Sequence, residues 1–283
     1  MYFWGIILIA ISTKMSRKSI LIQKKSFIKK TCFSACVFLL LVILTQSNLF
    51  AQNVSRINNH WIFGNSNHLD FVTDPPTTSV LPIALDNIEQ SCAIADGTGN
   101  LLFYVGTPAS NTTQMNVYDA NNNIMPSGSG IIGDYSSTMG ALIIQMPGNC
   151  NKYYIFYTSI SGHLRYSVVD MTANSGNGDV VVAQKNILIY ANGSEKMLAA
   201  QKGISEDYWI VTRNNNSGTS NADIFLAFEV TSTGVNTTPV VSTFSNFQGT
   251  GNNVNGWMCF NDDYTKIADA SNQNCEFNTY NFN

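Results

Sequence analysis

The stretch Cys92-Ala93-Ile94-Ala95-Asp96-Gly97-Thr98-Gly99-Asn100-Leu101-Leu102-Phe103-Tyr104 contains two short apolar strands joined by a polar turn. This strand–turn–strand unit recurs four times between Ser91 and Asn283, at a spacing of about 50 to 60 residues. The first strands of the four copies are small and apolar: 92–95, 141–144, 197–200 and 257–260. The second strands are aromatic or β-branched: 101–104, 153–156, 208–211 and 266–269. The third strands are of alternating apolar and polar character: 117–119, 166–170, 225–229 and 277–280.

A repeat of this length that is made only of short strands is typical of a β-propeller. We therefore predict an all-β fold of four-stranded antiparallel blades. The blades are expected over about 89–132, 140–182, 196–242 and 255–283, the last without its outer strand. Strands within 57–82 precede them and can add to the last blade to close a ring. Because an open ring would leave an apolar face exposed to water, we expect the natural protein to continue past Asn283.

Residues 1–51 have the pattern of a secretory signal peptide. They hold seven Lys or Arg and no Asp or Glu, and an apolar run over 32–44 precedes a small residue, Ala51. We expect cleavage after Ala51, and Met15 is a candidate for the true start because 15–51 already has the whole pattern. The apolar run is short for a membrane span, with an uncleaved anchor as the alternative. The mature domain, 52–283, is therefore expected to pass through the export machinery, to lack a stable membrane span, and to be secreted or held at the cell surface.

Removal of this leader changes the charge balance. Eight Lys or Arg and all eighteen Asp or Glu lie after residue 51, so the formal net charge of this part is −10. An acidic chain lacks the basic surface that binds phosphate backbones, which makes nucleic acid a poor candidate partner.

Four cysteines follow the leader, and none has the spacing of a metal site: Cys92, Cys150, Cys259 and Cys275. Export permits disulfides. Cys92 and Cys259, however, fall on first strands of non-neighbouring copies, where small buried side chains are expected. Cys150 lies in a Gly-Asn-Cys-Asn turn and is the one expected to be exposed or bridged.

An ordered series of motifs resembles the N-terminal β-propeller of large secreted and surface proteins of Bacteroidetes, which are often described as gliding-motility-associated or PKD-domain proteins. The motifs are 61–65 with 69–71, 96–104, 136–138 before 141–144, 147–149 before 153–156, 164–171, 194–196 and 207–212. The resemblance covers 57–283 and implies a seven-bladed WD40-like or YVTN-like ring, about four blades of which are in this chain. It also implies a longer polypeptide that is cargo of type IX secretion. Two positions depart from the family: 261–264 replaces a Ser-Pro-Asp-Gly turn, and Arg213 stands where His is common.

Propeller geometry predicts where a ligand would bind. The loops before each first strand and after each second strand meet on one face around the axis, which we call the loop face. The polar residues expected there are Glu89, Ser137, Thr138, Glu195, Lys196, Arg213 and Asn255. The aromatic stripe of 103–104, 153–154 and 208–209 is expected to pack between blades, with a carbohydrate-stacking platform as the alternative.

No catalytic motif occurs in the chain, and the resembling family supplies no catalytic residues. His60, His68 and His163 form no cluster and are expected as solvated loop residues. Asp96 and Asn100 are weak calcium candidates, because oxygen-bearing residues alternate in that turn, but a later bidentate carboxylate is missing. A plain hairpin turn is the other interpretation, and no cofactor is otherwise indicated.

These observations favour an exported, non-enzymatic propeller module that binds protein or glycan, or has a structural role, on a bacterial surface. A carbohydrate-active hydrolase or lyase is the alternative, and it needs Glu89, Glu195 and Arg213 to meet near the axis. A lectin-like glycan-binding module is a third hypothesis.

Overall fold

The computed structural model describes residues 55–159, 161–214, 224–243, 255–271 and 276–282. The chain divides into two compact units, Met1–Ser55 and Arg56–Asn283, and the description below concerns the second. The signal-peptide prediction for 1–51 and the prediction for Cys275 lie outside the described residues.

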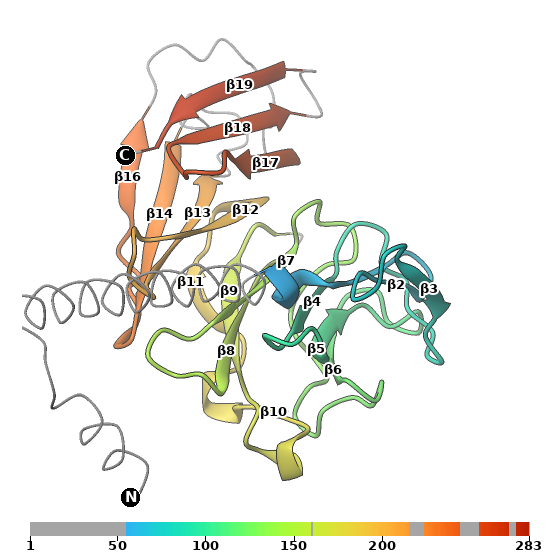
Figure 1. Ribbon diagram of the computed structural model, residues 1–283. Coiled ribbons are helices and arrows are strands. Elements are labelled where there is room, and N and C mark those ends of the chain that lie inside the picture. The colour runs from blue at the N-terminus through green and yellow to red at the C-terminus, as the bar shows by residue number, and fades with distance from the viewer. Residues whose placement is uncertain (1–54, 160, 215–223, 244–254, 272–275, 283) are drawn as a thin grey trace, which may run out of the picture. The chain divides into compact units, whose positions relative to one another are not determined.

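The described part of this unit is built of five antiparallel sheets, which we number in chain order (Figure 1). The first sheet holds β1 (His60–Phe63), β2 (Asn67–Asp70) and β3 (Thr77–Val80). The second holds β4 (Cys92–Ala95), β5 (Leu101–Gly106) and β6 (Asn116–Asp119). The third holds β7 (Ala141–Gln145), β8 (Lys152–Thr158), β9 (Leu164–Asp170), β10 (Asp179–Val180) and β11 (Ile187–Tyr190). The fourth holds β12 (Gly193–Gln201), β13 (Tyr208–Asn214), β14 (Ile224–Thr231), β15 (Gly234–Val235) and β16 (Val240–Thr243). The fifth holds β17 (Gly256–Phe260), β18 (Lys266–Ser271) and β19 (Glu276–Asn281).

Short 3-10 segments are the only helical elements among the described residues: η1 (Ser55–Asn58), η2 (Asn174–Gly176) and η3 (Val182–Gln184). None of them has the length and hydropathy of a bilayer-spanning helix. The prediction of an all-β, antiparallel fold is therefore confirmed.

The width of the sheets varies. In the third sheet β10 and β11 both pair along β9, and in the fourth β15 and β16 both pair along β14, so each of these sheets is four strands wide. In the second sheet the fourth position is reduced to two isolated bridges, Met115–Ile131 and Tyr118–Ile124. Among the described residues only the third and fourth sheets have the predicted four-strand width.

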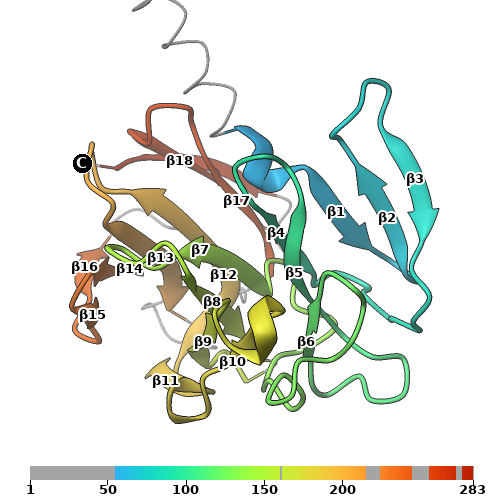
Figure 2. The ribbon, with the colours of Figure 1, turned by 60° about the horizontal axis from the view of Figure 1, so that its bottom comes forward.

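The first strands of successive sheets contact each other in chain order: β1 with β4, β4 with β7, β7 with β12, and β12 with β17. Each sheet then runs outward from its first strand as an antiparallel meander (Figure 2). The strands expected within 57–82 form a separate sheet, whose first strand contacts that of the second sheet, and their role in closing a ring stays a prediction. The described sheets form no closed propeller, so four blades of seven stays a prediction.

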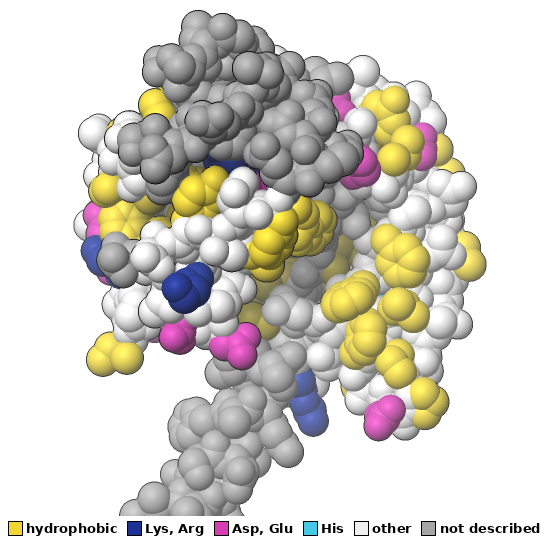
Figure 3. Space-filling model, turned by 90° about the horizontal axis from the view of Figure 1, so that it is seen from above, with side chains coloured by type: hydrophobic (Ala, Val, Ile, Leu, Met, Phe, Trp, Pro, Cys, Tyr) yellow, Lys and Arg dark blue, Asp and Glu magenta, His cyan; other side chains and the backbone are white. Residues whose placement is uncertain are grey.

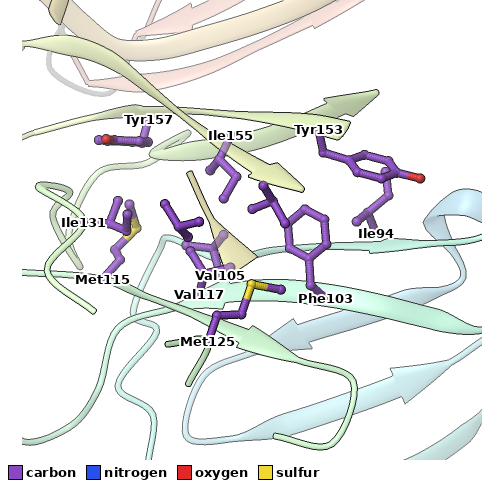
Figure 4. Packing of buried hydrophobic residues seen from close by; sticks show 12 residues of the cluster. Ile94, Phe103, Val105, Met115, Val117, Met125, Ile131, Tyr153, Ile155 and Tyr157 are labelled. Atoms are coloured by element: carbon purple, nitrogen blue, oxygen red, sulfur yellow. The ribbon is translucent and has the colours of Figure 1, made fainter. Parts of the chain in front are cut away.

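Apolar side chains fill the space between neighbouring sheets. Between the second and third sheets, Phe103 and Val105 of β5 point toward Tyr153, Ile155 and Tyr157 of β8 (Figure 4). Phe103 and Tyr153 meet edge to face, with ring centroids 5.5 Å apart. The other face of the third sheet packs against the fourth in the same way. Both faces of a middle sheet are therefore buried, which explains why its central strand is apolar or aromatic at successive positions and does not alternate.

Candidate functional site

Two cations and one carboxylate are buried between the fourth and fifth sheets. Lys196 lies on β12, Arg213 on β13 and Asp269 on β18, and their exposed fractions are 0%, 1% and 2%. The Nζ of Lys196 lies 2.6 Å from the Oδ1 of Asp269, and an amino group of Arg213 donates to the Oδ2 of Asp269. Asp269 thus bridges two cations of the neighbouring sheet through both of its oxygens.

Local irregularity of β12 places Lys196 in this cluster. The pairing register of β12 with β13 shifts between Gly193 and Met197, and a bulge of this kind re-aims the side chains within it. Arg213 stands opposite Phe225 on β14, and its guanidinium carbon lies 5.2 Å from the centre of that ring. Burial lowers the pKa of Lys196, and the hydrogen bond and charge of Asp269 oppose this shift. The carboxylate is therefore what allows two cations to remain in an apolar interface.

A second polar contact joins three sheets next to this cluster. The Oε2 of Glu195 accepts hydrogen bonds from the backbone nitrogen of Thr138 at 3.1 Å and from its hydroxyl at 3.4 Å. The backbone nitrogen of Gly256 donates to the same hydroxyl at 3.4 Å. Thr138 precedes β7, Glu195 lies on β12 and Gly256 starts β17, so the first-strand ends of the third, fourth and fifth sheets meet here.

The electrostatics of this meeting point are acidic. Partial burial raises the pKa of Glu195, hydrogen bonds from Thr138 oppose the rise, and the negative charges of Glu89 and Asp134 add to it. Asp134 is buried, and its Oδ1 caps the backbone nitrogen of Ser136 at 2.8 Å. Glu89 is exposed before β4, Asp134 precedes β7 and Glu195 lies on β12, so the charges of two other segments bear on Glu195 at this end of the sheets.

The loop-face residues predicted from the sequence divide into two groups. Glu89 is exposed, and Thr138, Glu195 and Asn255 are half-buried, with Asn255 directly before Gly256. Ser137, Lys196 and Arg213 are buried, contrary to the expected solvent-facing loops. Lys196 and Arg213 lie inside strands because Asp269 compensates their charge, and the hydroxyl of Ser137 has no hydrogen-bond partner among the described residues.

Most of the aromatic stripe packs between sheets, as expected, and these buried members cannot form a carbohydrate-stacking platform. Its members on β5 and β8 are buried between sheets: Phe103, Tyr104, Tyr153 and Tyr154. Tyr208 and Trp209 are half-buried, and the ammonium of Lys202 lies 5.1 Å from the centre of the Trp209 ring.

Two of the three histidines are strand residues, which corrects the expected loop positions. His60 is on β1 and His68 on β2, and the two side chains touch each other. His163 precedes β9, and its Nδ1 lies 2.8 Å from the hydroxyl of Ser161.

The turn at 96–100 is closed by its own hydrogen bonds. The Oδ1 of Asp96 accepts from the backbone nitrogens of Thr98 and Asn100 at 2.8 and 3.0 Å, and its Oδ2 accepts from the side-chain amide of Asn100 at 3.1 Å. Burial is the largest single influence and raises the pKa of Asp96, but these hydrogen bonds and that from the hydroxyl of Thr98 together outweigh it and bring the pKa to about 2. Asp96 and Asn100, the two weak calcium candidates, are therefore hydrogen-bonded to each other in a hairpin turn. No group of three or more His, Cys, Asp or Glu in the described ranges is arranged to hold a metal ion.

The three described cysteines are free thiols. Cys150 is exposed, as expected for its turn, and Cys92 is half-buried. Cys259 is exposed on the outward side of β17, which corrects the prediction that it is buried.

Comparison of the chain with protein-family models, with curated protein sequences and with solved structures gives no match.

Asp269 is the residue of this region that sequence analysis missed. The repeat places it in a second strand, where it lies in β18, but its partners are distant in sequence. A usable signal was present: Lys196 and Arg213 interrupt otherwise apolar strands, and such cations are almost never buried unless paired.

Proposed function

We propose that this chain is an exported, non-enzymatic β-propeller module that binds a protein or a glycan on a bacterial cell surface through its loop face. The single observation that supports this most directly is the contact of Thr138 with both Glu195 and the Gly256 backbone. It gathers polar residues of three separate repeats at one end of the sheets, where repeat folds present their binding loops. The finer architecture that we propose is a closed seven-bladed ring in which further blades complete this face.

The surface chemistry fits a neutral, hydrogen-bonding ligand. On the side of the molecule seen in Figure 3, charged side chains are scattered among neutral polar and apolar ones. The mature part has only eight Lys or Arg, so an anionic polymer has little to bind. Glycans and uncharged peptide segments are recognised by such hydrogen-bonding surfaces.

One observation favours the alternative of a carbohydrate-active enzyme. The pKa of Glu195 is raised, in part by the negative charges of Glu89 and Asp134, and glycosidases use two carboxyl groups of which the acid has a raised pKa. The third residue of that hypothesis, Arg213, is buried and paired with Asp269, so it is not at the surface to contact a sugar.

The test is binding of the secreted chain to a glycan array and to intact cells, with and without Ca²⁺. We expect Glu89→Ala and Glu195→Ala to weaken binding about tenfold or more, since each removes a loop-face group. Glu229→Gln is the control, because Glu229 lies on β14 and pairs with the half-exposed Lys202. Binding that is equal in all three variants contradicts the loop-face assignment. Turnover of glycosides, peptides or esters that disappears in Glu89→Ala or Glu195→Ala would instead support the enzyme.

A further inference from the structure

A chain of hydrogen bonds crosses from the first sheet to the second through two imidazoles. The Nε2 of His60 lies 2.8 Å from the carbonyl oxygen of Gly99, in the turn between β4 and β5. The Nδ1 of His60 lies 2.9 Å from the Nε2 of His68, and the Nδ1 of His68 lies 3.2 Å from the hydroxyl of Ser79. The pair therefore links β1, β2 and β3 with the hairpin turn of the neighbouring sheet.

The backbone carbonyl fixes the protons in this chain. A carbonyl oxygen only accepts, so the Nε2 of His60 carries a proton, and in the neutral ring its Nδ1 is then an acceptor. The short contact consequently requires a proton on the Nε2 of His68. The Nδ1 of neutral His68 is left to accept from the hydroxyl of Ser79. With both rings neutral, every nitrogen has a partner of the right kind.

The geometry of the ring contact agrees with a direct hydrogen bond. The ring centroids are 5.1 Å apart and the planes differ by 28°. This centroid distance is close to the 2.9 Å between the nitrogens plus the radius of each ring, so both nitrogens lie nearly on the line between the ring centres. The rings meet edge to edge, as a nitrogen lone pair facing an N–H requires.

One proton can be added to this arrangement and two cannot. If the Nδ1 of His68 is protonated, it donates a hydrogen bond to the hydroxyl of Ser79 and no longer accepts one, so the contact is kept. A second proton, on the Nδ1 of His60, would place two N–H groups of two cations against each other across 2.9 Å. The cost is high because His60 is buried, with an exposed fraction of 8%.

We propose that His60 and His68 form an acid-released latch that holds the turn at 96–100 against the first sheet. When both rings are charged, their mutual contact breaks and the His60–Gly99 bond is lost with it. The turn is otherwise held by Arg56, which donates to the carbonyl oxygen of Thr98 at 3.3 Å, and by close packing of Gly99 against Asn59 and Val72.

The surrounding charges are few. Asp70, across from His60 on β2, has its Oδ1 4.0 Å from the Nδ1 of His60, and that oxygen also accepts from the backbone nitrogen of Val72 at 2.8 Å. Asp96 lies in the turn itself, and Arg56 lies in η1. Burial and the neighbouring His60 lower the pKa of His68, while Asp70 opposes the shift. The single carboxylate at 4.0 Å can stabilise one positive charge and leaves the second uncompensated.

The sign of the pH effect follows from proton binding. The separated histidines can bind two protons, whereas the latched pair can bind only one, because a second would set two N–H groups against each other across 2.9 Å. Opening of the latch is therefore coupled to proton uptake. The latch is fully effective above about pH 6.5. Below that pH its opening equilibrium constant rises about tenfold for each pH unit, and the latch is lost.

The test is hydrogen exchange of the secreted chain between pH 7.5 and 5.0, corrected for the intrinsic exchange rate. We expect protection of the segments 59–72 and 95–104 to fall about tenfold for each pH unit below about 6.5, with little change in segments of the third and fourth sheets. In His68→Gln the amide nitrogen can still donate to His60 and does not titrate, so this pH dependence should disappear. His163→Gln, which removes a histidine outside the pair, should behave as the unmodified protein.

A measurement on the unmodified chain guards against a variant that fails to fold. Titration of the histidine ring carbons by NMR should show one proton taken up by the pair while the turn remains protected. Two rings that each protonate fully near pH 6.5 without loss of protection at 95–104, or an unchanged pH dependence in His68→Gln, would overturn the latch.

Discussion

Asp269 accepts a hydrogen bond from Lys196 at 2.6 Å although 73 residues separate the two in sequence and both are buried. This bond, together with that from Arg213, ties the fifth sheet to the fourth by charge as well as by apolar packing. Removal of the carboxylate would leave two cations in an apolar interface with no counter-charge.

We therefore expect Asp269→Asn to lower the free energy of unfolding by about 3 to 5 kcal/mol, as for other broken buried ion pairs. Lys196→Met should cost less, because one cation and one carboxylate remain. Urea unfolding measures both. Glu229→Gln breaks the more exposed pair with Lys202 and should cost less than about 1 kcal/mol. Equal losses for Asp269→Asn and Glu229→Gln would show that the buried cluster contributes no special stability.

Gly256 is predicted to be irreplaceable for steric reasons. Its φ is +137°, and an added Cβ would lie 2.0 Å from the carbonyl oxygen of Ala270 and 3.1 Å from the Cε of Lys196. Gly256→Ala should therefore be strongly destabilising, by several kcal/mol, because backbone must shift. Gly234→Ala is a matched control: its φ is +126°, but no atom lies within 4 Å of an added Cβ. Thermal unfolding of the two variants separates the clash from the backbone strain that they share, and similar melting temperatures would contradict the prediction.

Glu195 should make stability depend on pH with a defined sign. Its folded-state pKa is raised, chiefly by burial, so its contribution is fully present below the pKa of the unfolded chain, about 4.3, and is lost as the pH rises through the folded-state value. In Glu195→Gln the amide oxygen can accept the same bonds from Thr138 and never ionises. The stability of Glu195→Gln relative to the unmodified protein should therefore increase from pH 4 to pH 7. A difference that shrinks over this interval would contradict the raised pKa.

The interface of the second and third sheets should respond strongly to loss of volume. Phe103 has no exposed surface and contacts Tyr153 edge to face. Phe103→Ala should cost about 3 to 5 kcal/mol, the usual range for a large buried ring. Val182→Ala, at a side chain that is 73% exposed, should change stability by less than about 0.5 kcal/mol. A small effect of Phe103→Ala would mean that the two sheets do not fold as one unit.

Strand positions were largely predictable because both faces of most strands are buried. The predicted run Cys92-Ala93-Ile94-Ala95 coincides with β4, and the aromatic run beginning at Tyr153 lies inside β8. By contrast, no motif within the expected segment 57–82 marks β3 itself, because all four of its side chains are exposed and three are hydroxyls, so its sequence carries no strand-like alternation.

The polar residues of the loop face were harder to place than the strands. Lys196 and Arg213 were expected in solvent because isolated charges favour water. Their burial depends on Asp269, which only the register between two separate sheets brings close. His60 and His68 likewise come together because Ile62, two positions after His60, pairs with His68 across an antiparallel ladder. Contacts of this kind depend on pairing partners that one strand's sequence does not specify.

In each of the third and fourth sheets, two short strands share the outermost position, and this arrangement has a consequence for protein engineering. Between β15 and β16 the chain leaves the sheet margin and returns to it through the short segment 236–239. An epitope or affinity sequence inserted at 236–239 would lengthen a surface loop whose side chains are mostly exposed. Such a site offers a handle for immobilising or labelling the domain that leaves the first-strand ends unobstructed.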